Sequence, residues 1–229
     1  MAQLALASIV FIALHILPAL KLRESLIKRI GDPAYMGLFS LASVLGMAWM
    51  IVAYQNAPVG EPLWITGPAV RWSTAFIMLF AFILVVTGTT PKNPTSVLGK
   101  GALKDNHQGT GVFAITRHPV MWAIIIWSML HLINRPDMRS LLFFGSMGLL
   151  GLAGSMRQEV RKQEEFGKAW EQFASQTSHV PFLAILQGKA QLRITDLGGW
   201  RIMTAVLLWL ATLYLHAHIL GVSPLAVLV

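Results

Sequence analysis

Histidine is the residue type of this sequence that is best placed for chemistry. The 229 residues include seven histidines and no cysteine, which excludes thiolate ligands and thiol nucleophiles. Four histidines lie inside apolar stretches and a fifth opens one of them: these are His15, His131, His216, His218 and His118. A neutral imidazole can ligate iron without adding charge to an apolar site. Several histidines on different apolar stretches therefore favour a metal or heme site. The alternative is that each histidine forms a hydrogen bond between helices.

The composition indicates that these apolar stretches are membrane-spanning helices. Hydrophobic residues make up 55% of the chain and charged residues 12%, about half the charged fraction of a soluble domain. This excludes a soluble enzyme and a disordered protein as classes. A helix needs about 20 mostly apolar residues to cross a bilayer. The sequence predicts one all-α membrane domain of residues 1–229 with six spans, at residues 2–20, 34–54, 69–88, 119–134, 140–156 and 200–221.

The basic residues predict how this bundle is oriented. The formal net charge is +8, and 15 of the 18 Lys and Arg residues lie between spans one and two, three and four, or five and six. By the positive-inside rule these connections face the cytoplasm, so we expect both termini outside. The three basic residues on the opposite side are Arg71, Arg135 and Arg139. Because the positive charge is explained by the membrane, we expect the lipid bilayer as a partner and no nucleic acid.

Two of the predicted cytoplasmic segments are longer than a turn. Residues 89–117 are rich in Gly, Pro, Asn and Lys, which indicates an irregular binding loop or active-site lid. Residues 157–176 have apolar side chains at helical spacing, which predicts a charged amphipathic helix that continues from span five. This helix either lies on the lipid headgroups or covers a cofactor. We expect His107 and His179, which fall in these basic loops, to lie away from any site among the spans.

Two sequence blocks resemble the NnrU family, bacterial membrane proteins associated with nitric oxide and nitrite metabolism in denitrification. The blocks are HILPALKLR at residues 15–23 and ITRHPVMWAIIIWSMLH at residues 115–131. The resemblance covers nearly the whole chain and implies a location in the bacterial inner membrane. The same blocks resemble 15-cis-zeta-carotene isomerase, a heme b enzyme. That resemblance implies His15 and His131 as axial iron ligands, with Ser128 in place of a cysteine that has been proposed as an alternative ligand.

The depths of the histidines in the predicted spans point to other pairs. His15 lies near the cytoplasmic end of span one and His131 near the outer end of span four, so their depths differ by about 15 Å at the rise of an α-helix. His216 and His218 match the depth of His131 better, and His118 matches that of His15. The resemblance favours His15 with His131, and the depth comparison favours a pair that includes His118, His216 or His218.

A third resemblance is to isoprenylcysteine carboxyl methyltransferase. Arg117, His118 and Pro119 match its Arg-His-Pro motif, and Glu159, Phe166-Gly167 and Val180-Pro181 match a run over its S-adenosylmethionine site. This implies Arg117 and His118 as cofactor-binding residues. The sequence departs from that pattern at Ala123, Gln158, Trp170 and Phe173. We therefore interpret this match as shared architecture rather than a shared reaction.

The function that we expect from the sequence is a heme b-binding membrane protein with a redox or isomerase-type role. That role is linked to denitrification or to carotenoid-like chemistry. Besides the lipid bilayer, we expect a small or lipophilic substrate as a partner. One alternative is a methyltransferase that uses S-adenosylmethionine. Another is a non-enzymatic membrane accessory protein for denitrification enzymes. The sequence does not identify catalytic residues or the oligomeric state.

Overall fold

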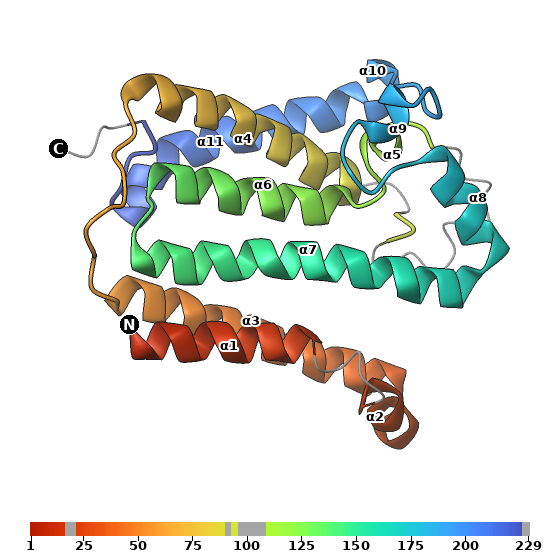
Figure 1. Cartoon of the computed structure of the whole chain (residues 1–229), viewed down its shortest axis with the longest axis horizontal. Helices are drawn as coiled ribbons and strands as arrows, with labels where there is room; N and C mark the ends of the chain where they lie inside the picture. Colours follow the sequence, from red (N-terminus) through yellow and green to blue (C-terminus); the bar gives the residue numbers. More distant parts are fainter. Residues whose placement is uncertain (17–21, 90–92, 96–108, 226–229) are drawn as a thin grey trace.

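The structure is a computed structural model that describes residues 1–16, 22–89, 93–95 and 109–225. In these ranges the regular secondary structure consists of α-helices, and six apolar helices lie lengthwise in one bundle, some parallel and some antiparallel to their neighbours (Figure 1). These are α1 (Ala2–Ile16), α3 (Asp32–Asn56), α4 (Pro68–Thr89), α6 (Pro119–Asn134), α7 (Met138–Phe166) and α11 (Gly199–Leu220). Among the described helices, α3, α4, α7 and α11 are long and apolar enough to cross a membrane, and α1 and α6 are shorter apolar helices. The predicted all-α membrane bundle is confirmed.

The six helices pack in a continuous row. Along the row the order is α3, α1, α7, α6, α4 and α11, because α1 packs on α3 and α7, α6 packs on α7 and α4, and α11 packs on α4. Helix α7 therefore lies between α1 and α6 (Figure 1). The end helices α3 and α11 leave many large apolar side chains exposed, such as Leu41 and Leu207. Such faces suit contact with lipid, where an apolar side chain costs nothing to expose.

Glycines bring neighbouring helices of the row close together. A Cβ atom placed on Gly88 of α4 would lie 2.6 Å from Cγ of Pro119, the first residue of α6. A Cβ atom on Gly151 of α7 would lie 3.0 Å from Ile125 and 3.3 Å from the carbonyl oxygen of Met121, both on α6. A side chain at Gly88 would overlap Pro119, and one at Gly151 would require its neighbours on α6 to shift. Gly151 of α7 thus lies at the packing contact with α6.

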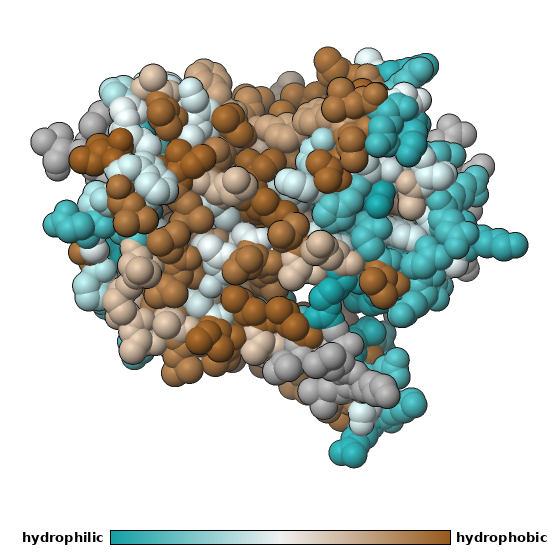
Figure 2. All heavy atoms as spheres, in the orientation of Figure 1, coloured by the Kyte–Doolittle hydropathy of each residue, from teal (hydrophilic) through white to brown (hydrophobic). Residues whose placement is uncertain are grey.

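The two ends of the bundle differ in structure. The polar end carries the five short helices of the described residues, which are α2 (Leu22–Ile30), α5 (Val112–Ile115), α8 (Lys168–Gln176), α9 (Leu183–Leu186) and α10 (Ile194–Leu197). The far end consists of the connections at residues 57–67 and 135–137. Hydrophilic side chains gather at the polar end, while apolar side chains cover much of the middle of the bundle (Figure 2).

The polar end differs from the sequence prediction in one element. The amphipathic segment 157–176 is two helices, because the chain turns at Gly167 with φ of +51° and separates α7 from α8. Trp170 and Phe173 of α8 are 2% and 1% exposed and pack in one apolar cluster with Phe113 and Ile115 of α5. Helix α8 therefore holds the short helices onto the bundle. Most of the predicted loop 89–117 lies outside the described residues.

Candidate functional site

The polar end contains a cluster of charged and polar side chains that we call the polar centre: Arg117, His118, Glu159 and His179. Arg117 and His118 lie just before α6, which begins at Pro119, a residue well suited to the first position of a helix. Glu159 lies on the charged part of α7, beyond the apolar residues 140–156 that form its predicted span. The backbone of Arg117 donates a hydrogen bond of 2.9 Å to the carbonyl oxygen of Ser178, which brings the segment containing His179 alongside.

Glu159 is the hub of the polar centre. Arg117 binds it through two parallel hydrogen bonds, from Nε to Oε1 at 2.6 Å and from Nη2 to Oε2 at 3.0 Å. His118 donates from Nε2 to the same Oε1. Burial alone would raise the pKa of Glu159, but the hydrogen bonds from His118 and Arg117 outweigh it and lower the pKa from 4.5 to about 2. The carboxylate is therefore ionised, and both of its oxygens already accept hydrogen bonds. Glu159 thus positions its neighbours rather than acting as a free base.

His179 is the imidazole of the polar centre that keeps a free lone pair. Its Nε2 lies 3.0 Å from Oγ of Ser155, and that hydroxyl donates its own hydrogen to the carbonyl oxygen of Leu152 at 2.8 Å. Ser155 can therefore only accept, so the proton of the neutral ring is on Nε2 and the lone pair is on Nδ1. Burial and repulsion by His118 lower the pKa of His179 from 6.5. The ring thus stays neutral at physiological pH, 5.0 Å from the ring of His118 between centroids.

His179 was predicted to lie away from any site among the spans, and it lies instead in the polar centre outside them, which the sequence did not indicate. Its carbonyl oxygen also accepts hydrogen bonds of 2.7 Å from Thr116 Oγ1 and from Trp122 Nε1. The signal that could have located it is the adjacent Val180-Pro181, part of the methyltransferase-like run. The structure brings this run close to the Arg-His-Pro motif, since the ring centroid of Trp170 lies 6.5 Å from that of His118.

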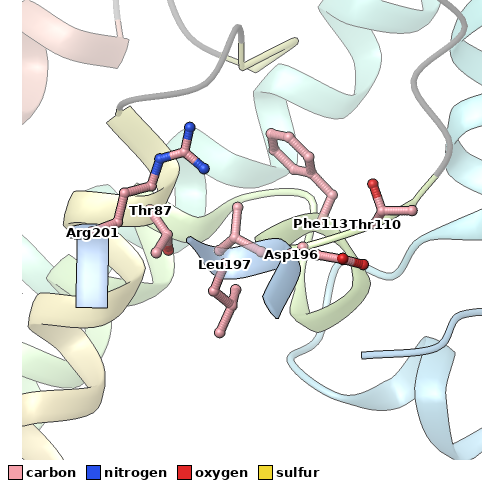
Figure 3. Close-up of a pocket in the computed structure, with 8 residues that line it drawn as sticks. Thr87, Thr110, Phe113, Asp196, Leu197 and Arg201 are labelled. Atoms are coloured by element: carbon pink, nitrogen blue, oxygen red, sulfur yellow. The ribbon is translucent and has the colours of Figure 1, made fainter. Parts of the chain in front are cut away.

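A pocket at the polar end shares no residue with the polar centre. It is lined by Thr87 of α4, Phe113 of α5, Asp196 and Leu197 of α10 and Arg201 of α11, together with Thr110, Gly111 and Val112. In Figure 3 the guanidinium of Arg201 and the carboxylate of Asp196 point in different directions along its walls. This pocket therefore presents separated charges at the polar end rather than the imidazoles of the polar centre.

The structure does not bring His15 and His131 together. His15 lies near the end of α1, where its ring packs between Phe11 and Phe39. His131 lies near the other end of the bundle, on α6, where its ring stacks on Phe144 of α7 at 4.5 Å between centroids. Because α7 separates α1 from α6, these two imidazoles cannot reach one iron in this arrangement. Within the described residues no group of three or more His, Asp or Glu side chains is placed to hold a metal ion.

The histidine that the structure brings to His131 is His216 of α11. The two ring centroids are 6.5 Å apart, and the ring planes differ by 27°. The Nδ1 atom of each ring contacts a backbone carbonyl oxygen, that of Trp127 for His131 and that of Val222 for His216. A carbonyl oxygen can only accept, so each Nδ1 carries a proton and each neutral ring has its lone pair on Nε2. His218 lies on an exposed part of α11, with its ring against Tyr214.

Comparison with known proteins identifies the family. A sequence model described as NnrU protein matches residues 3–224, nearly the whole chain. The chain belongs to the NnrU family. This NnrU protein is also 31% identical to the chloroplastic 15-cis-zeta-carotene isomerase of Zea mays over 195 residues, which are 82% of this chain and 51% of that protein. It is 28% identical to the enzyme of the same name from Arabidopsis thaliana over 170 residues, 72% of this chain and 45% of that one.

The NnrU chain spans about half the length of these two plant relatives. No solved structure matches it.

Proposed function

We propose that this NnrU protein is an isomerase-type membrane enzyme that acts on a lipophilic polyene, and that it carries a b-type heme between His131 and His216. Family membership and the similarity to two carotene isomerases support the reaction class. The observation that carries the proposal is the His131–His216 pair, with a lone pair on Nε2 of each ring.

The donor set of this pair fits a heme iron. Because a metal–imidazole bond is about 2 Å long, two rings on one metal have their centroids about 6 Å apart, and the observed separation is 6.5 Å. Metal-binding histidines commonly donate their other ring N–H to a backbone carbonyl, as both rings do here. Helices α6 and α11 each pack on α4, and the C-terminal parts of α6 and α11 approach each other, because the rings of His131 and His216 lie 6.5 Å apart.

The chain's own residues would orient the heme and admit the substrate. The carbonyl oxygens of Trp127 and Val222 fix which nitrogen of each ring is protonated, and Phe144 supports the ring of His131. When bound, the heme supplies a redox-active iron inside an apolar bundle. Exposed apolar side chains of α11, such as Leu215, give a bilayer-dissolved hydrocarbon access from the side. The substrate class follows from this apolar surrounding and from the name of the relatives.

The proposal is tested by assaying the purified chain in phosphatidylcholine vesicles that contain 15-cis-zeta-carotene. Chromatography measures the ratio of isomers with time. We expect conversion by the wild type, loss of conversion in His131→Ala and His216→Ala, and retention in His15→Ala, the matched change outside the pair. Absence of conversion by heme-loaded wild type would overturn the proposed reaction.

A second candidate function is a methyltransferase that uses S-adenosylmethionine. The observation that favours it is the assembly of Arg117 and His118 with Glu159, which lies 42 residues after Arg117 in the sequence. Calorimetric titration with S-adenosylmethionine distinguishes the two: a methyltransferase binds it, and the proposed isomerase does not. An accessory role in denitrification predicts neither heme nor S-adenosylmethionine binding.

A further inference from the structure

The far end of the bundle gathers the three arginines that lie outside the basic connections. These are Arg71 at the start of α4, and Arg135 and Arg139 on either side of the turn between α6 and α7. Hydrogen bonds join the two regions, since Asn134 Nδ2 donates to Thr74 Oγ1 at 2.7 Å and Thr66 Oγ1 donates to Asn134 Oδ1 at 3.5 Å. Residues far apart in the sequence therefore form one positively charged cluster.

One carboxylate serves two of these arginines. Oδ2 of Asp137 lies 3.4 Å from Nε of Arg135 and 3.8 Å from Nε of Arg139. Its other oxygen caps α7 by accepting from the backbone N–H of Ser140 at 2.8 Å. Arg139 is further stabilised by the ring of Tyr54, 4.8 Å from its guanidinium carbon. The charges of the cluster sum to +2 because Asp137 neutralises only one of the three.

Arg71 lacks a carboxylate within the described residues. It is 3% exposed, its Nε donates a long hydrogen bond of 3.4 Å to the carbonyl oxygen of Thr66, and its Nη2 is buried without a partner there. Arg135 lies near enough to repel it. A buried cation without a counter-ion is costly. An arginine held in this way at a membrane-spanning helix is therefore a candidate binding group whose partner has to be found.

We infer that Arg71 and Arg135 bind an oxyanion of the phosphate class at the far end of the bundle. The guanidinium group donates in a planar fork that matches two oxygens of a phosphate. Nη2 of Arg71 is free to donate. The side chain of Arg135 uses its Nε for Asp137 and makes no further hydrogen bond within the described residues. The bound oxyanion would lower the charge excess of the cluster and accept a hydrogen bond from the unpaired Nη2 of Arg71. It is either the headgroup of an anionic phospholipid or a free anion.

Thermal unfolding of the detergent-purified full chain tests this inference. The first arm compares inorganic phosphate with chloride at equal ionic strength. The second compares phosphatidylcholine vesicles with and without phosphatidylglycerol. We expect one or both anions to raise the unfolding temperature of the wild type. A response to phosphate alone identifies a free anion, and a response to phosphatidylglycerol alone identifies a lipid headgroup.

The variants separate this site from general charge effects. In Arg71→Gln the apparent affinity for the effective anion should fall about tenfold or more, the loss expected for one charge-assisted contact. Without anion the same variant should be at least as stable as wild type, because it removes an unpaired buried charge. Arg135→Gln, at a more exposed position, should also lose the response, whereas Arg193→Gln, an exposed arginine at the polar end, should keep it. No response in either arm, or an equal response in Arg71→Gln, would overturn the inference.

Discussion

At the scale of single residues, the ionised Glu159 stabilises the polar end and makes it sensitive to acid. Its folded pKa of about 2 lies below the value of 4.5 that it has when unfolded. The contribution of Glu159 to the free energy of unfolding is therefore complete above about pH 4.5 and is lost as the pH falls towards about 2. The pKa of His179 is also lowered in the folded state. The free energy of unfolding therefore already begins to decrease as the pH falls below 6.5, the pKa of this histidine in the unfolded chain.

Glu159→Gln tests this assignment directly. The variant leaves Arg117 without its counter-ion, so we expect it to lose about 2 kcal/mol of stability at pH 7. We also expect its stability to change less than that of wild type between about pH 4.5 and 3, because the titrating group is gone. Unfolding in sodium dodecyl sulfate over a pH series measures both effects. Glu164→Gln, an exposed position on the same helix, is the control, and equal acid sensitivity of Glu159→Gln and wild type would refute the role of Glu159.

The sequence indicates how deep each histidine lies in the bundle, but not which histidines lie next to each other. Matching depths in the spans favoured His216 or His218 as a neighbour of His131, and the structure brings the ring of His216 to 6.5 Å from that of His131. The family resemblance favoured His15, which the intervening helix α7 keeps away. Depth follows from helix rise and can be counted along a sequence. The order of the helices in the row cannot be counted in this way, because it depends on which helix faces pack together.

At the scale of elements, the glycine at the crossing of α4 and α6 sets their separation. We expect Gly88→Ala to cost about 1–3 kcal/mol of stability, because its Cβ would overlap Pro119 and force the helices apart. Gly145→Ala is the matched control on α7, since a Cβ there meets nothing within 4 Å. Alanine also favours a helix over glycine, so the control should be neutral or slightly stabilising. Unfolding in sodium dodecyl sulfate measures both, and equal effects would contradict this packing.

The long apolar helices could be predicted from the sequence, whereas the short elements of the polar end could not. A run of apolar residues determines a span almost alone, because the bilayer leaves few other structures. The division of residues 157–176 depends instead on one glycine and on burial of Trp170 and Phe173 against α5. Such contacts between distant segments are invisible in the periodicity of either segment.

At the scale of the whole molecule, the arrangement places the basic connections at the polar end and the arginine cluster at the far end. The positive-inside rule predicts that the polar end faces the cytoplasm. Because the chain has no cysteine, single cysteines at Lys28 and Glu61 can be labelled without background. We expect an impermeant maleimide to label the Glu61→Cys variant from outside intact cells and the Lys28→Cys variant only after lysis. Labelling of both from the same side would contradict the topology.

The absorption spectrum of the detergent-purified protein tests the central claim, a heme between His131 and His216, most directly. We expect a Soret band in the wild type and in His15→Ala, and its loss in His131→Ala and His216→Ala, because each of these removes an imidazole that would hold the iron while the apolar helices still insert. A wild type without a Soret band, or a band that survives in His216→Ala and disappears in His15→Ala, would contradict it.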